Sequence, residues 1–324
     1  MRVIRALACS LSMFLSVVVC AQSQIGAPGN PIRIVVPYPP ASSGDSIARR
    51  LAPKLAQEMG NTIIIENRQG ANGNIGMSFV AKAKPDGYTF ILGSDIQFAV
   101  APVLFQNLPY DVDRDFEPVG PAANIDLVIV AYPGLPANNL QDLVALAKKK
   151  PGQVSFASTG IGSTHQLFME LLKMKAGIDM IHVPYAGTGP AIPNLISGEV
   201  QMMLVGVPQA ISNINGGRLK PLAVGALQRL PMLPNVPTIS ESGFPDFEAN
   251  NLWGVWAPAK TPDAVVKKMR AALVKVTNDP EIKEWYASQG LTGMDSHAVM
   301  VARLASDRRK WAEVIKANNI KPGE

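Results

Sequence analysis

Cysteine and histidine, side chains that often bind transition metals or act in catalysis, are scarce in this sequence. Its 324 residues include two cysteines, Cys9 and Cys20, and three histidines, His165, His182 and His297. Both cysteines lie within the first 21 residues, so the chain beyond them has no disulfide, no thiol nucleophile and no thiolate metal site. No His-Glu-x-x-His sequence or close pair of histidine and acid supports a zinc site. We therefore predict no metal site and no cofactor.

Long apolar runs are also lacking, and the one near the N-terminus has the features of an export signal. Arg2 and Arg5 precede an apolar run over residues 6–19, and small residues follow at Cys20 and Ala21. The run is too short to span a membrane as a helix. The pattern predicts a secretory signal peptide over residues 1–21, cleaved after Ala21, with a buried N-terminal helix as the alternative. An exported chain that folds without disulfides is typical of the periplasm.

Charge is modest and spread along the chain. Charged residues make up 17% of the sequence, and the net charge of +5 includes Arg2 and Arg5, so the chain after Ala21 carries +3. The clearest basic run, residues 148–150, ends an amphipathic pattern, where cations complement the helix dipole. With no recognised nucleic-acid motif, we predict no nucleic-acid partner.

Short apolar runs alternate with helical patterns, which predicts an α/β fold of mostly parallel sheets flanked by helices. Pro53 is expected to kink or break its helix. The expected strands cover residues 32–36, 62–66, 89–92, 127–130, 154–157, 180–183, 200–205, 220–226 and 252–257. The expected helices cover residues 47–59, 76–82, 140–149, 165–175 and 192–197, with further helices up to about residue 317.

The pattern restarts near residue 140, which predicts two similar α/β domains. Strands over residues 125–131 and 253–258 are expected to cross between them, and the C-terminal helices would return to the first domain. Domain 1 would then comprise residues 24–124 plus 251–324, and domain 2 residues 125–250. Such an interlaced connection makes a hinge and a ligand cleft.

Two loops of small residues each follow a predicted strand and open a predicted helix. The first loop covers residues 37–45 and the second loop residues 158–165. Such loops offer backbone N–H groups and hydroxyls at a helix N-terminus, where an anion binds readily. Neither loop contains Lys or Arg, so the pair predicts reversible capture of a small anion. Ser163 and Gln166 match a capping box, and a capped helix without a ligand is the alternative for this loop.

Signals of catalysis are weak, and we predict no catalytic residue and no enzyme. The glycines of residues 70–76 have the spacing Gly-x-x-Gly-x-x-Gly, which differs from the dinucleotide fingerprint. Ser163 and His165 lie two residues apart at a helix start, point to different sides and lack a Gly-x-Ser-x-Gly elbow. In the run 111–115 aspartates alternate as in a calcium loop, but Phe116 occupies the position of the required glycine. An exported α/β hydrolase stays as the less favoured alternative.

Several blocks that recur in order resemble a known family. They are Ile34-Val35-Val36-Pro37-Tyr38 with Asp45 and Arg49, residues 66–76, Pro85-Asp86-Gly87-Tyr88-Thr89, Leu108-Pro109-Tyr110-Asp111, residues 158–165, His182-Val183-Pro184-Tyr185-Ala186-Gly187, and Pro234-Asn235-Val236-Pro237-Thr238. Together they resemble the tripartite tricarboxylate transporter substrate-binding proteins, the Bug or TctC-like family.

The resemblance implies a periplasmic binding protein fold of type II, with two domains, a hinge and a ligand cleft. It implies capture of a small carboxylate (mono-, di- or tricarboxylate, aliphatic or aromatic) and delivery to integral membrane permease subunits of a tripartite tricarboxylate-type transporter. A monomer would suit a binder that closes on a hinge. A ligand-sensing protein for a membrane receptor is the alternative that the sequence leaves open.

The same resemblance places the ligand-binding residues on both loops and after the third strand. Carried over by position, they are Tyr38, Ser42, Ser43, Asp45, Ser94, Asp95, Ser158, Gly162, Ser163, Thr164, His165 and Tyr185. The family usually has a Gly-Gly pair where this chain has Ala41-Ser42. Candidates for the distal end of the ligand, chosen by position, are Phe98, Asn250, Asn251 and Trp253.

Overall fold

The computed structural model describes residues 30–293 and 296–322, so the predicted signal peptide and its cleavage site lie outside the described residues. Within these ranges, ten strands form one sheet in the order β2-β1-β3-β9-β4-β7-β5-β6, with β8 and β10 also paired to β4. The strands are β1 (Ile32–Val36), β2 (Ile63–Asn67), β3 (Thr89–Ser94), β4 (Phe116–Ala131), β5 (Ser155–Ser158), β6 (Ile181–Pro184), β7 (Met202–Gly206), β8 (Lys220–Val224), β9 (Asn250–Pro258) and β10 (Leu291–Thr292).

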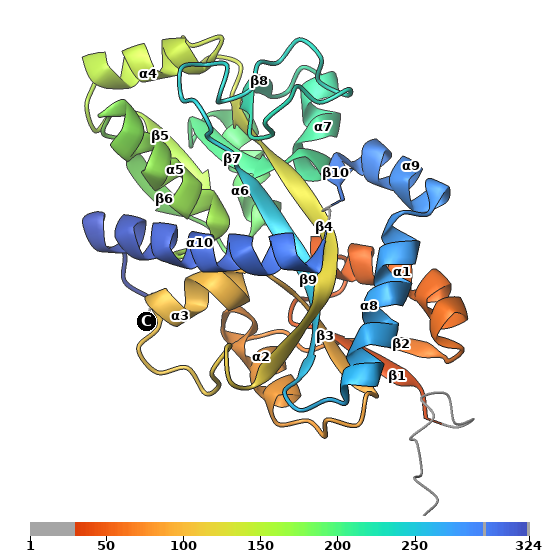
Figure 1. Cartoon of the computed structure of the whole chain (residues 1–324). Helices are drawn as coiled ribbons and strands as arrows, with labels where there is room; N and C mark the ends of the chain where they lie inside the picture. The colour runs from red at the N-terminus through yellow and green to blue at the C-terminus, as the bar shows by residue number, and fades with distance from the viewer. Residues whose placement is uncertain (1–29, 294–295, 323–324) are drawn as a thin grey trace, which may run out of the picture.

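The sheet is parallel towards both ends and antiparallel in the middle. Strand β1 pairs in parallel with β2 and β3, and β5 pairs in parallel with β6 and β7. Strands β9 and β4 join these two groups through antiparallel pairs. The predicted α/β fold with two groups of parallel strands is therefore confirmed, and the two groups form the two halves seen in Figure 1.

Strand β4 runs through both halves of the molecule (Figure 1). Residues 116–126 pair with β9, whereas residues 127–131 pair with β7 and β8. Only the second part was expected from the sequence, because Pro118, Gly120 and Pro121 interrupt the apolar pattern. The ladder accommodates them with shifts of register on either side of Gly120, as bulges do.

Helices cover the two halves, and the last of them joins both. They are α1 (Ser43–Met59), α2 (Asn74–Ala81), α3 (Ala101–Leu104), α4 (Leu140–Lys149), α5 (Thr164–Ala176), α6 (Thr188–Ser197), α7 (Val207–Asn215), α8 (Asp263–Thr277), α9 (Pro280–Gln289) and α10 (His297–Ala317); a π-helical turn, η2 (Ile96–Val100), precedes α3. In Figure 1, α10 lies along the boundary between the halves. Its Trp311 packs edge-on against Phe168 of α5, and its Arg308 donates to the carbonyl oxygen of Phe98 in η2.

Two helices differ from what the sequence suggested. Helix α1 runs without a break through Pro53, because Leu51 and Leu55 on either side of it are buried against the sheet. Pro53 itself is exposed, so water can reach the carbonyl oxygen that its missing N–H leaves free. Helix α7 was not expected at all, since its N-cap Gly206 has no capping side chain and the two asparagines near its end are weak helix formers.

No helix in the part of the chain that the structure describes is both long enough and apolar enough to cross a membrane.

Candidate ligand site between two loops

A cavity of about 100 Å³ lies between the two loops that the sequence singled out. Its walls come from the first loop, from the η2–α3 segment and from the second loop. The lining residues are Tyr38, Ile96, Val100, Ala101, Leu104, Phe105, Thr159, Ile161, Gly162 and Ser163. Of the twelve predicted ligand-binding residues, Tyr38, Gly162 and Ser163 thus line the cavity directly.

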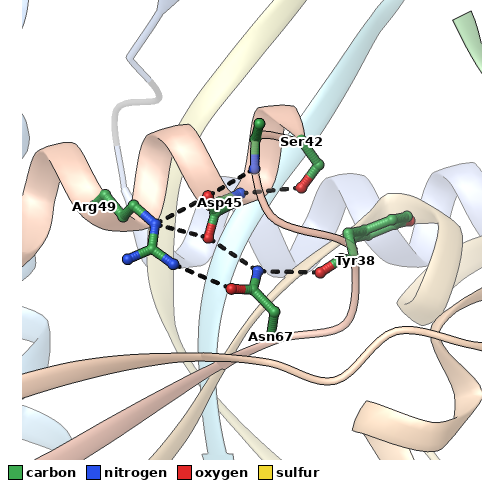
Figure 2. Close-up of polar contacts among 6 residues, drawn as sticks. Tyr38, Ser42, Asp45, Arg49 and Asn67 are labelled. Atoms are coloured by element: carbon green, nitrogen blue, oxygen red, sulfur yellow. Dashed lines mark hydrogen bonds and ion pairs between the residues drawn. The ribbon is translucent and has the colours of Figure 1, made fainter. Parts of the chain in front are cut away.

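Asp45 holds the first loop in place and does not line the cavity. Its carboxylate accepts hydrogen bonds from the Ala41 N–H (2.9 Å), Arg49 Nε (2.9 and 3.0 Å) and Asn67 Nδ2 (2.9 Å). Asn67 also donates to the carbonyl oxygen of Tyr38 (3.1 Å), so the network ties the loop to β2 (Figure 2). Ala41 has a φ of 63°, a conformation that favours glycine, and its bond to Asp45 stabilises that turn.

Ser42 and Ser43 also make bonds of their own. Ser42 is the N-cap of α1, because its Oγ accepts from the Asp45 N–H (3.3 Å). Ser43 Oγ accepts from Gln209 Nε2 (2.8 Å), at the start of α7 in the other half of the molecule. Ser43 therefore links the two halves.

Gln97 positions Tyr38 in the cavity wall, and sequence reasoning missed it. Its Nε2 donates to the Tyr38 hydroxyl (2.7 Å), while its Oε1 accepts from the N–H and Oγ of Ser94 (2.9 and 3.0 Å). The Tyr38 ring also packs on Trp253, with 5.4 Å between centroids. Burial raises the pKa of the Tyr38 phenol, which therefore stays neutral and keeps its O–H.

Asp95 directly follows β3 and takes part in a series of hydrogen bonds that reaches the second loop. Asn251 Nδ2 lies 3.4 Å from Asp95 Oδ1 and 2.7 Å from Thr164 Oγ1. Asp95 and Thr164 are both buried, so they support the cavity from behind. Burial, with the charge of Asp307 adding to it and that of Arg303 opposing it, raises the pKa of Asp95 to about 7.

Asp95→Asn is expected to stabilise the protein at alkaline pH. A carboxyl whose pKa is raised in the folded state takes up protons on folding, so its contribution to stability falls as pH rises from about 4 towards 7. The asparagine side chain does not ionise, so the variant does not lose this stability as the pH rises. Urea denaturation should show the variant more stable than the parent at pH 8 and equal to it near pH 4. A variant that is less stable at pH 8 would show that the charged carboxylate is needed.

The second loop is shaped by its own side chains. Ser163 is the N-cap of α5, with its Oγ accepting from the Gln166 N–H (3.3 Å). The predicted capping box is only half formed, because Gln166 Oε1 accepts from the Gly162 N–H (2.8 Å) and the Ser163 N–H bonds to the Gly160 carbonyl oxygen. Gly162 has a φ of 76°, which turns its N–H towards Gln166.

The remaining predicted residues pack behind this loop. Ser158 Oγ lies 2.7 Å from His182 Nε2, and His165 Nδ1 lies 2.8 Å from Thr159 Oγ1. The hydroxyl of Tyr185 accepts from Asn194 of α6 (3.2 Å). Burial lowers the pKa of His165 to about 4, so its imidazole is neutral near pH 7 and adds no positive charge to the cavity.

The start of α5 supplies donors next to the cavity, directly after the lining residue Ser163. The first N–H groups of a helix have no partner within the helix. In α5 these belong to Thr164 and His165, since the Gln166 N–H is taken by Ser163. The positive end of the helix dipole adds to them, so an anion in the cavity would be stabilised without a cationic side chain.

Two of the residues expected near the distal end of the ligand belong to the core. Phe98 stacks on Trp256 with 3.6 Å between ring centroids, and Asn250 bonds to Arg303 of α10. Neither lines the cavity. Among the described residues no group of three or more histidines and acids is placed to hold a metal ion.

Two halves of α/β structure with a cavity between them, whose polar groups come from loops at helix starts, define a solute-binding protein. Residues 47–320 match the family described as "Tripartite tricarboxylate transporter family receptor" (TctC), and the chain belongs to this family. The resemblance noted in the sequence is thus confirmed.

Similar proteins include Protein BugT of Bordetella pertussis, 33% identical over 296 residues that cover 91% of each chain. Among solved structures, "R. palustris Rpa4515 with adipate" is 30% identical with a TM-score of 0.82 and covers 91% of this chain and 99% of that one. MatC from Rhodopseudomonas palustris "with bound malate" is 28% identical with a TM-score of 0.77 and covers 89% and 100%. These likenesses support a solute-binding protein of the type II fold.

Proposed function

We propose that this chain is a periplasmic solute-binding protein that captures a small carboxylate between the two loops. It would deliver the ligand to the integral membrane permease of a tripartite tricarboxylate-type transporter. The observation that carries this proposal is the cavity between the two loops, lined by neutral hydroxyl groups from both halves. The family membership and the adipate and malate in the two similar structures support it.

In this proposal the ligand carboxylate accepts hydrogen bonds from Tyr38, Thr159, Ser163 and the first N–H groups of α5. A hydrogen bond to a charged group contributes about 1.5–3 kcal/mol. Four such bonds, less the cost of ordering ligand and loops, are compatible with micromolar affinity. Asp45, Gln97 and Asn251 would act by positioning the two loops.

Closure of the two halves would follow the predicted domain boundaries, with residues 24–124 plus 251–324 in domain 1 and residues 125–250 in domain 2. The hinge would lie where β4 passes from one group of strands to the other. The bonds from Gln209 to Ser43 and from Asn251 to Thr164 join the halves and would stabilise the closed, ligand-bound form. Both halves and the hinge belong to one chain, so a monomer is sufficient for this closure.

We assign the protein no catalytic role. The Ser163 hydroxyl caps its own helix, and His165 Nδ1 is paired with Thr159, so the two do not form a nucleophile and base. Export by the signal peptide of residues 1–21, with cleavage after Ala21, would bring the chain to the periplasm, where the permease subunits are its partner.

Ser163→Ala is expected to weaken carboxylate binding roughly tenfold or more, because it removes one bond to a charged group. The protein from residue 22 onward, refolded to remove retained ligand, would be titrated calorimetrically with the acids that raise its melting temperature. Ser296→Ala is the matched control, since Ser296 caps α10 through the Val299 N–H, outside the cavity lining.

Both variants should lose about 1 kcal/mol of stability through the missing cap, whereas only Ser163→Ala should lose affinity. If no carboxylate stabilises the refolded protein, the proposed function is wrong. If Ser163→Ala binds as tightly as the parent, the assignment of the second loop is wrong.

A further inference from the structure

The lining of the cavity consists of hydroxyl-bearing residues, called the polar end, and hydrocarbon residues, called the apolar end. Hydroxyl groups come from Tyr38, Thr159 and Ser163, at the two loops. The hydrocarbon residues come from the η2–α3 segment, together with Ile161, which lies between Thr159 and Ser163 in the second loop. Its residues are Ile96, Val100, Ala101, Leu104, Phe105 and Ile161.

None of the residues that line the cavity is charged. The arginines on neighbouring elements are engaged elsewhere. Arg49 bonds to Asp45 and Asn67, and Arg308 bonds to Asp113 and to the backbone of η2. The half-buried imidazole of His165 is bonded to Thr159. A negative group at the apolar end of the cavity would therefore meet no cation.

These features oppose a ligand with two carboxylates. A buried carboxylate without partners loses its hydration and gains nothing in return. A methyl, methylene or phenyl group at the same place gains from burial against the hydrocarbon wall. The hydroxyl groups of the polar end favour one carboxylate, whereas the apolar end favours a hydrocarbon group.

We propose that the ligand is a monocarboxylate with a short apolar body, such as benzoate or hexanoate, and that the η2–α3 segment and Ile161 select it. The proposal rests on the carboxylate-binding function proposed above. The cavity is small, about 100 Å³, so the apolar body of the ligand has to be short. The similar structures named above hold adipate and malate, so this chain would differ from them in the apolar end of the ligand.

Matched pairs of acids test the inference on refolded protein. Hexanoate and adipate, and benzoate and terephthalate, differ only by the second carboxylate. Calorimetric titration should show each monoacid binding at least tenfold more tightly than its diacid. Diacids that bind equally or more tightly would overturn the inference and leave the proposed function standing. If no acid of either kind binds, the proposed function fails with it.

Ile161→Lys should reduce the preference for the monoacid, since it places a cation beside the apolar end. The side chain is 38% exposed, so a lysine can be accommodated. We expect the ratio of adipate to hexanoate affinity to rise about tenfold. Ile181→Lys is the matched control, because Ile181 is a 51% exposed isoleucine of the same half that does not line the cavity. An unchanged ratio in Ile161→Lys, or an equal change in both variants, would exclude Ile161 as a selecting residue.

Discussion

Asp45→Ala is expected to lower the free energy of unfolding by about 1–3 kcal/mol, because two donors near the base of the first loop lose their charged acceptor. A hydrogen bond to a charged group contributes about 1.5–3 kcal/mol, and donors on the exposed Ala41 and the half-buried Asn67 regain part of this from water. The Ala41 N–H and Asn67 both bond to this carboxylate, which is 3% exposed. Arg49 is half exposed and regains water, so its loss adds little. The loop should loosen, and ligand affinity should fall with it.

Asp263→Ala provides the matched control for this experiment. Asp263 also lies in the first turn of a helix and pairs with a basic residue four positions on, Lys267, but both side chains are largely exposed. Exposed pairs contribute about 0–1 kcal/mol. Chemical denaturation should therefore separate the two variants clearly, and equal losses would show that the Asp45 network does not hold the loop.

The pH dependence of stability offers a second readout of the same network. Burial alone raises the pKa of Asp45, but the hydrogen bonds from Arg49, Ala41 and Asn67 outweigh it, so the pKa is lowered. Stability from a lowered carboxyl pKa is fully present above the usual value of about 4 and is lost as pH falls below it. The parent should thus lose stability more steeply than Asp45→Ala in acid.

Most strands and helices could be predicted because the buried strands are continuous apolar runs bounded by loops. Strand β1 has the predicted bounds, and α4 begins and ends at the predicted residues. The first half of β4 could not be predicted, because its prolines and Gly120 are tolerated only through pairing with β9, a partner more than a hundred residues away. Local sequence does not reveal such a pairing.

Contacts between distant segments also limit what could be predicted of the candidate site. Residues at the starts of α1 and α5 could be found from local patterns, since a capping serine bonds to its own helix and a glycine permits the turn of its own loop. Gln97 and Gln209 could not, because each bonds to a residue of a distant segment; Asn251 was chosen by position, but its bond to Thr164 was not foreseen. Transfer by position also does not tell which way a side chain points, and so Asp45 was expected to contact a ligand but bonds within its own loop.

Gly162→Ala is expected to weaken ligand binding by roughly 5- to 150-fold. A methyl group at Gly162 would lie 2.2 Å from Leu104 Cδ2, which belongs to the opposite wall of the cavity. Overpacking of this kind costs about 1–3 kcal/mol, which converts to that range of affinity. Because the two residues meet where the halves close, the closed form should bear most of this cost.

Gly177→Ala separates the collision from backbone strain. Gly177, after the end of α5, has a φ of 60°, close to the 76° of Gly162, but an added methyl group there has no neighbour within 4 Å. Both variants should lose about 1–2 kcal/mol of stability from the left-handed conformation. Calorimetric titration should show reduced affinity only for Gly162→Ala. A similar reduction in both variants would mean that α5 transmits the strain, and no reduction in Gly162→Ala would mean that Leu104 moves aside and that this contact does not limit closure.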